Sequence, residues 1–159
     1  MKHCFGTIGL TLLLLLLAAC GTQASTLTGS NNQAATATPL PLQHCGTIYT
    51  LGQQKTPTDQ KAAKTAEDCF WQAYQQCHPA TLVYSQASVD TAMIHNFALQ
   101  KQNGKCIIID VLQHVIVPHA PQSAGNSTCT SLTQQADGLH VSACNHEENV
   151  LVPAGSDER

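Results

Sequence analysis

Two histidines and an aspartate in the middle of the chain are residue types suited to acid–base chemistry. His95 precedes the dipeptide Asn103-Gly104, and Asp110 and His114 follow it. Asn-Gly between two β-rich runs predicts a two-residue hairpin, because a type I′ turn needs positive φ at both central residues. In that register all three side chains share one face of the sheet. Asp110 and His114 are then diagonal neighbours of His95, with Cα atoms about 7–8 Å apart.

Such a cluster has a catalytic and a structural interpretation. In the first, Asp110 orients His95 and leaves the other ring nitrogen free to act as a general base, with His114 nearby. In the second, Asp110 is hydrogen-bonded structurally and the histidines lie at a solvated sheet edge. The sequence contains no G-x-S-x-G, P-loop, G-x-G-x-x-G or H-E-x-x-H motif, which favours the structural interpretation. We predict no cofactor.

Six cysteines lie beyond the first twenty residues, and an even number in a small exported domain predicts three disulfides. They are Cys45, Cys69, Cys77, Cys106, Cys129 and Cys144. A metal site is the alternative, because histidines lie beside several of these cysteines. The chain has no C-x-x-C, however, and zinc sites usually contain closely spaced ligand pairs. We therefore predict disulfides and no metal.

Spacing restricts how these cysteines can pair. Cys69 and Cys77 lie in one predicted helix, about 12 Å apart along its axis, whereas a disulfide tolerates at most about 7 Å between Cα atoms. Each must therefore bond to another element. A four-residue turn from 135 to 138 would place Cys129 directly opposite Cys144 and allow that bridge. A two-residue turn at Asp137-Gly138 would leave them diagonal and too distant.

The N-terminus has the pattern of an export signal. A basic residue is followed by an apolar stretch, Ile8 to Ala19, which is too short for a membrane-spanning helix. It ends in Leu17-Ala18-Ala19-Cys20, which resembles the lipobox of bacterial lipoproteins. That resemblance implies cleavage before Cys20, acylation of its sulfur, and an anchor on the extracytoplasmic face of the cell membrane. An ordinary cleaved signal and an uncleaved signal anchor are the alternatives.

Composition divides the chain into four segments. Residues 1–19 form the signal peptide, and 20–43 hold the lipidated cysteine and an uncharged linker too poor in large apolar residues to fold alone. Residues 44–153 form a single disulfide-rich domain, and 154–159 form a polar tail. The net charge of −3 with seven Lys and Arg excludes the basic face that nucleic-acid binding needs.

The domain is predicted to be α+β, with one long N-terminal helix packed on an antiparallel sheet of about five strands. The helix opens at Thr56 as N-cap with Pro57 in its first turn, and it ends at Cys77. The strands are 81–88, 91–100, 106–117, 129–134 and 139–144, with a short first strand at 44–51, a further edge strand at 150–152 and a loop at 118–128. This element order resembles the cystatin-like and NTF2-like architectures, and the latter often hold acid–base chemistry in a cleft.

These observations favour one function over two alternatives. We expect an exported lipoprotein, anchored in the lipid bilayer through acylated Cys20, whose stabilised domain binds an unknown protein or small molecule. The first alternative is a small lipid-anchored enzyme that uses His95, Asp110 and His114. The second is a metal-binding module.

Overall fold

The structure is a computed structural model that describes residues 40–145 and 149–156. Its elements are β1 (Gln43–Leu51), α1 (Gln60–Gln76), β2 (Ala80–Ala87), β3 (Thr91–Gln102), β4 (Lys105–Ile116), β5 (Gln122–Gln135), β6 (Gly138–Cys144) and β7 (Val150–Pro153). The strands form a single sheet in chain order. The α+β class is confirmed. The predicted signal peptide, Cys20 and all but the end of the linker lie outside the described residues.

Three parts of the fold prediction are wrong. The helix is not N-terminal, because β1 precedes it, and the sheet has seven strands rather than about five. The sheet is also mixed, since β1 runs parallel to β2 while the other neighbours are antiparallel. Parallel neighbours need a long crossover connection, and α1 provides it here. The two additional strands, β1 and β7, are the two edges of the sheet.

The helix begins later than predicted. Asp59 is the N-cap, and its side chain accepts a hydrogen bond from the backbone N–H of Ala62 at 2.9 Å. The predicted cap, Thr56, lies outside the helix. Cys77 ends the helix in the left-handed conformation, with φ of 49°.

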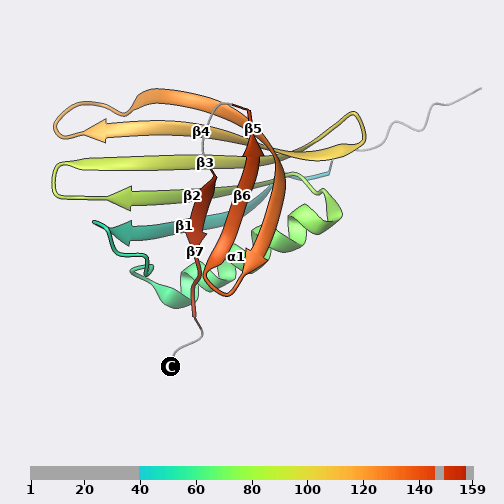
Figure 1. Ribbon diagram of the computed structural model, residues 1–159, viewed down its shortest axis with the longest axis horizontal. Helices are drawn as coiled ribbons and strands as arrows, with labels where there is room; N and C mark the ends of the chain where they lie inside the picture. Colours follow the sequence, from blue (N-terminus) through green and yellow to red (C-terminus); the bar gives the residue numbers. More distant parts are fainter. Residues whose placement is uncertain (1–39, 146–148, 157–159) are drawn as a thin grey trace, which may run out of the picture. The chain divides into compact units, whose positions relative to one another are not determined.

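The sheet curls around one face of this helix. In Figure 1, β1 to β4 run side by side, whereas β5 bends and carries β6 and β7 at a steep angle to them. The helix contacts β1, β2, β5 and β6, so it lies within the curl. The buried residues of β5 are odd-numbered up to Cys129, whereas the next buried residue, Leu132, is even-numbered. The strand therefore changes which of its alternate side chains face the core, and this change marks the bend.

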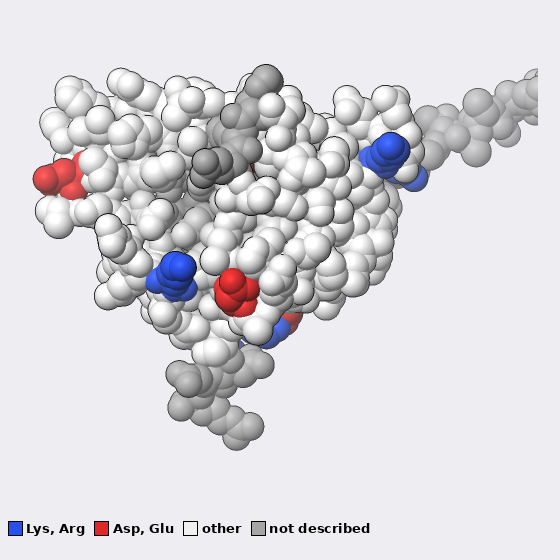
Figure 2. Space-filling model, in the orientation of Figure 1, with Lys and Arg blue, Asp and Glu red and all other residues white. Residues whose placement is uncertain are grey.

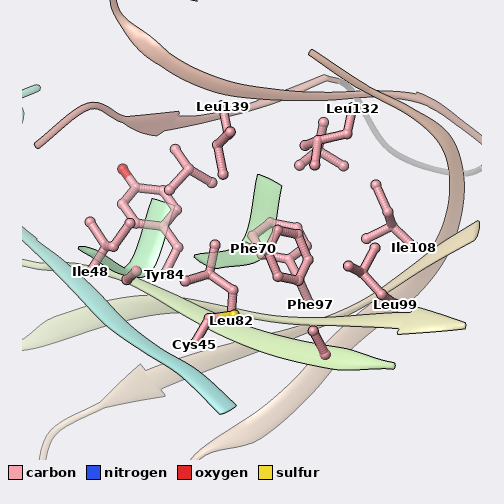
Figure 3. Packing of buried hydrophobic residues seen from close by; sticks show 14 of the residues in the cluster. Cys45, Ile48, Phe70, Leu82, Tyr84, Phe97, Leu99, Ile108, Leu132 and Leu139 are labelled. Atoms are coloured by element: carbon pink, nitrogen blue, oxygen red, sulfur yellow. The ribbon is translucent and has the colours of Figure 1, made fainter. Parts of the chain in front are cut away.

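The core fills the space between α1 and the concave face of the sheet. The rings of Phe70 on α1 and Phe97 on β3 lie 6.3 Å apart at their centroids and are almost fully buried. Leucine and isoleucine side chains from six strands, β1 to β6, surround them (Figure 3). Three of the large buried side chains in this view, Ile48, Leu82 and Leu139, come from β1, β2 and β6. The core therefore joins both ends of the sheet to the helix.

The start of β5 corrects the predicted loop at 118–128. Gln122 to Thr128 is strand, although it is rich in Ser, Gly and Asn. It pairs with β4, placing Ser127 opposite Asp110 and Asn126 opposite Val111. Strand propensity depends on context, and pairing with the largely buried strand β4 overrides the weak local preference of this segment.

The surface carries few charges. Figure 2 shows isolated basic and acidic side chains on a largely uncharged face. Among the described residues, no helix has the length and apolar character required to span a lipid bilayer.

The β5–β6 turn should be sensitive to a side chain at Gly138. This residue has φ of 133°, and a Cβ there would overlap the backbone carbonyl of Val152 on β7. We expect Gly138→Ala to lower the free energy of unfolding by about 3 kcal/mol, from overpacking and backbone strain together. Gly52→Ala is the matched control, since Gly52 also has positive φ but has open space around it. Urea unfolding of both variants checks the difference, and equal losses would contradict the role of the overlap.

Candidate functional site

The hairpin register predicted from Asn103-Gly104 is confirmed. Both turn residues have positive φ, 51° and 78°. His95 lies opposite Leu112 and Phe97 opposite Asp110, so the histidine and the aspartate are diagonal neighbours on the concave face. His95 Nδ1 lies 2.7 Å from Asp110 Oδ2.

This histidine–aspartate pair is buried and its ring is held in place. His95 is 8% exposed and Asp110 is 1% exposed. The imidazole stacks against Tyr84 on β2 and Phe97 on β3, with ring centroids 5.9 and 5.6 Å away. The two neighbouring aromatic rings therefore hold the imidazole from its sides, and the hydrogen bond to Asp110 limits its rotation.

The hydrogen bond defines what His95 can do chemically. An ionised carboxylate only accepts hydrogen bonds, so Nδ1 carries the proton when Asp110 is charged. Nε2 is then the acceptor nitrogen, as a general base requires. Within residues 40–145 and 149–156, no hydrogen bond occupies Nε2.

Ser127 is a polar neighbour that the sequence analysis missed, because it lies in the segment predicted as a loop. It is 3% exposed and pairs directly with Asp110 across β4 and β5. Asp110 Oδ1 and Ser127 Oγ are both buried without a hydrogen-bond partner. A hydroxyl donates and a carboxylate accepts, so the two groups are complementary to each other or to one bridging water.

His114 shares the concave face with the pair but is not bonded to it. It lies opposite Met93, one row farther along the sheet than His95, and it is exposed. Met93, Leu112 and His114 line a pocket of about 240 Å³, together with Gln113 and Ala124. The structure thus brings His95 and Asp110 together and places His114 in a neighbouring hollow.

A second pocket lies on the other side of Met93. It measures about 220 Å³ and is lined by Gly52, Gln53, Gln86, Ala87, Ser88 and Thr91 as well as Met93. Met93 is 43% exposed and borders both pockets. A methionine side chain is flexible and adapts to irregular contacts. His95 lines neither pocket, although Met93 lies two residues before it on β3 and Leu112 lies opposite it on β4.

The cysteines agree with part of the disulfide prediction. Cys45 on β1 is bonded to Cys69 on α1, and Cys129 is bonded to Cys144. The second pair lies directly opposite across β5 and β6, because the turn spans 135 to 138 as the favoured alternative required. Cys69 and Cys77 are not bonded to each other, as helix geometry predicted.

Cys77 and Cys106 are unbonded in this structure. The described segments also contain no group of three His, Cys, Asp or Glu side chains close enough together to coordinate a metal ion.

Comparison with known proteins does not place the chain in a family. No family model matches it, and no significant match is found among the curated proteins or the solved structures. The function of the site therefore rests on the geometry described above.

The His95–Asp110 pair should contribute measurably to stability. We expect Asp110→Asn and His95→Gln each to lower the free energy of unfolding by about 1–3 kcal/mol, because each leaves a buried polar partner poorly satisfied. In a double-mutant cycle the two losses should be less than additive by at least about 1 kcal/mol. His114→Gln, on the same face but exposed, is the control and should change stability by less than about 0.5 kcal/mol. Fully additive losses in denaturant unfolding would contradict the pairing.

Proposed function

We propose that this chain is an exported lipoprotein whose domain binds a small, mainly apolar ligand at the open end of its concave sheet face. Acylated Cys20 holds it at the extracytoplasmic face of the cell membrane. The two pockets that share Met93 are the observation that supports the binding role. The lipobox-like residues 17–20 and the disulfides support the location.

Disulfides agree with export because they persist in oxidising compartments and are rare in reducing ones. Cys45–Cys69 and Cys129–Cys144 both involve residues that belong to the buried core or pack against it. A domain that relies on such bonds for stability needs a compartment in which they form. The apolar stretch before Cys20 supplies the signal for reaching that compartment.

The site favours binding over catalysis because of access. Met93 and His114 are exposed at the pocket, whereas His95 is nearly buried and lines neither hollow. A general base must come within hydrogen-bond reach of the substrate proton. The exposed groups at the open end are therefore better placed to meet a ligand than the buried pair.

The lining indicates the chemical class of the ligand. Met93, Leu112 and Ala124 offer apolar contact, while Gln113 and His114 offer hydrogen bonds at the same pocket. Each hollow is smaller than the roughly 300–1,000 Å³ of drug-sized sites. We therefore infer a small amphipathic molecule, such as a medium-chain carboxylic acid, with its apolar body against Met93 and its polar group near His114.

Lipid attachment can be tested independently of ligand binding. Full-length protein produced in an exporting bacterium should incorporate an alkyne-labelled fatty acid and fractionate with membranes, because two or three acyl chains hold a protein on a bilayer stably. Cys20→Ser should lose both the label and the membrane association. Cys4→Ser is the matched control and should retain them. An unlabelled, soluble wild-type protein would exclude the proposed anchor.

Ligand binding can be followed on Met93 itself, which is one of two methionines in the chain. With methyl-labelled methionine, titration with octanoate should shift the Met93 methyl signal, and the Met93→Ser variant should bind at least about tenfold more weakly, a loss of about 1.4 kcal/mol. Val89→Ser removes an apolar side chain that is 92% exposed and lines neither pocket, so it should bind normally. Equal weakening by both variants, or no shift at all, would overturn the assignment.

An enzyme that uses the buried pair is the second candidate function, and the 2.7 Å contact between His95 and Asp110 favours it. Measuring turnover of an octanoate ester alongside octanoate binding distinguishes the enzyme from the binding module. Turnover of the ester that is lost in His95→Ala, while octanoate binding is retained, would favour the enzyme. Binding without turnover favours the binding module.

A further inference from the structure

Cys77 and Cys106 lie together at the end of α1. Cys77 is the C-cap of the helix, and its thiol donates a hydrogen bond of 3.9 Å to the backbone carbonyl of Gln100 on β3. The next residue on that strand, Lys101, pairs with Cys106 on β4. The Cys77 thiol therefore lies against the strand pair that carries Cys106.

Cys77 is also close enough to the Cys106 thiol to affect its pKa. Burial, together with a hydrogen bond and charge repulsion from Cys77, raises the pKa of the Cys106 thiol to about 12, and burial contributes most. Both residues are partly exposed, so a small reagent or a partner protein has access to the pair.

The conformation of Cys77 is a second, independent observation. Its φ of 49° lies in the left-handed region, which is strained for a residue with a side chain and which glycine usually occupies at a helix C-terminus. Glycine would avoid the strain at this position but would offer no thiol. With cysteine here, the thiol lies against β3. This favours a role for the sulfur itself.

We propose that Cys77 and Cys106 are a redox-active pair that closes a third disulfide by thiol–disulfide exchange. The Cys77 thiolate attacks one sulfur of a donor disulfide, either a small-molecule disulfide or an oxidised dithiol protein, and releases one donor thiol. The Cys106 thiol then loses its proton and attacks the Cys77 sulfur, which releases the second donor thiol. Two electrons pass to the donor, and the two thiol protons end on its sulfurs.

This bridge would link parts of the fold that are not yet covalently joined. Cys45–Cys69 joins α1 to β1, and Cys129–Cys144 joins β5 to β6. The β3–β4 hairpin carries neither bond, although it holds His95 and Asp110. A Cys77–Cys106 bond would fasten the end of α1 to this hairpin and reduce the freedom of the unfolded chain.

Peptide mapping tests the pairing directly. Purified full-length protein with the pair reduced is incubated with oxidised glutathione, its remaining thiols are blocked, and it is digested with trypsin and chymotrypsin. We expect a linked species of peptides 75–82 and 106–112, from cleavage after Tyr74, Leu82, Lys105 and Leu112, which disappears on reduction. Recovery of both peptides with blocked thiols, or with glutathione on each, would overturn the proposal. So would binding of a metal ion that protects both thiols from blocking.

Thermal unfolding of oxidised variants tests the consequence. Cys77→Ser and Cys106→Ser should each lower the Tm by about 10 °C, and the double variant should fall no further, because either change removes the whole bridge. Cys77→Gly removes the bridge while relieving the left-handed strain, so it should lose less than Cys77→Ser. Additive losses in the double variant would contradict a bond between the two residues. The result does not depend on lipid attachment or on octanoate binding.

Discussion

The packing of α1 against the concave face of the sheet is the constraint on which the rest of the molecule depends. Seventeen residues of helix extend about 25 Å, whereas the twelve-residue strands β3 and β4 extend about 40 Å. The helix therefore covers only part of the concave face. Phe70 and Phe97 seal the covered part, while Met93 and His114 lie where the cover ends. A hollow at one end of the sheet follows directly from this mismatch in length.

The His95–Asp110 pair lies at the boundary between the covered and open parts. Burying a carboxylate is costly unless it is hydrogen-bonded, and Asp110 has one bonded oxygen and one without a partner. Residues farther into the core on the same strands, such as Leu99 and Ile108, are entirely apolar and buried. The concave face thus changes from an apolar row at Leu99 and Ile108 to rows that each carry one polar side chain toward the open end. A ligand at Met93 would lie next to this polar pair without displacing it.

Local chemistry explains which parts of this arrangement could be predicted from the sequence. Asn103-Gly104 demands positive φ at two consecutive residues, so it determined the β3–β4 register and the His95–Asp110 contact without any tertiary information. The turn from 135 to 138 similarly placed Cys129 opposite Cys144. Ser127 could not be found in this way, because its strand forms only through pairing with β4. The pockets at Met93 could not be predicted from the sequence either, because they depend on how far α1 extends over the sheet.

The sulfur atoms reinforce the same division of the molecule. Cys45 and Cys129 belong to the buried core, with Cys45 next to Leu82 in Figure 3, and Cys77 and Cys106 lie near each other at the end of α1. None of them lies near Met93 or His114. A chain with only 4% aromatic residues has little bulk with which to build a core, so cross-links in the covered half compensate for that shortage. The open end at Met93 and His114 carries no cross-link, and weaker local packing of this kind is what the proposed ligand binding would require.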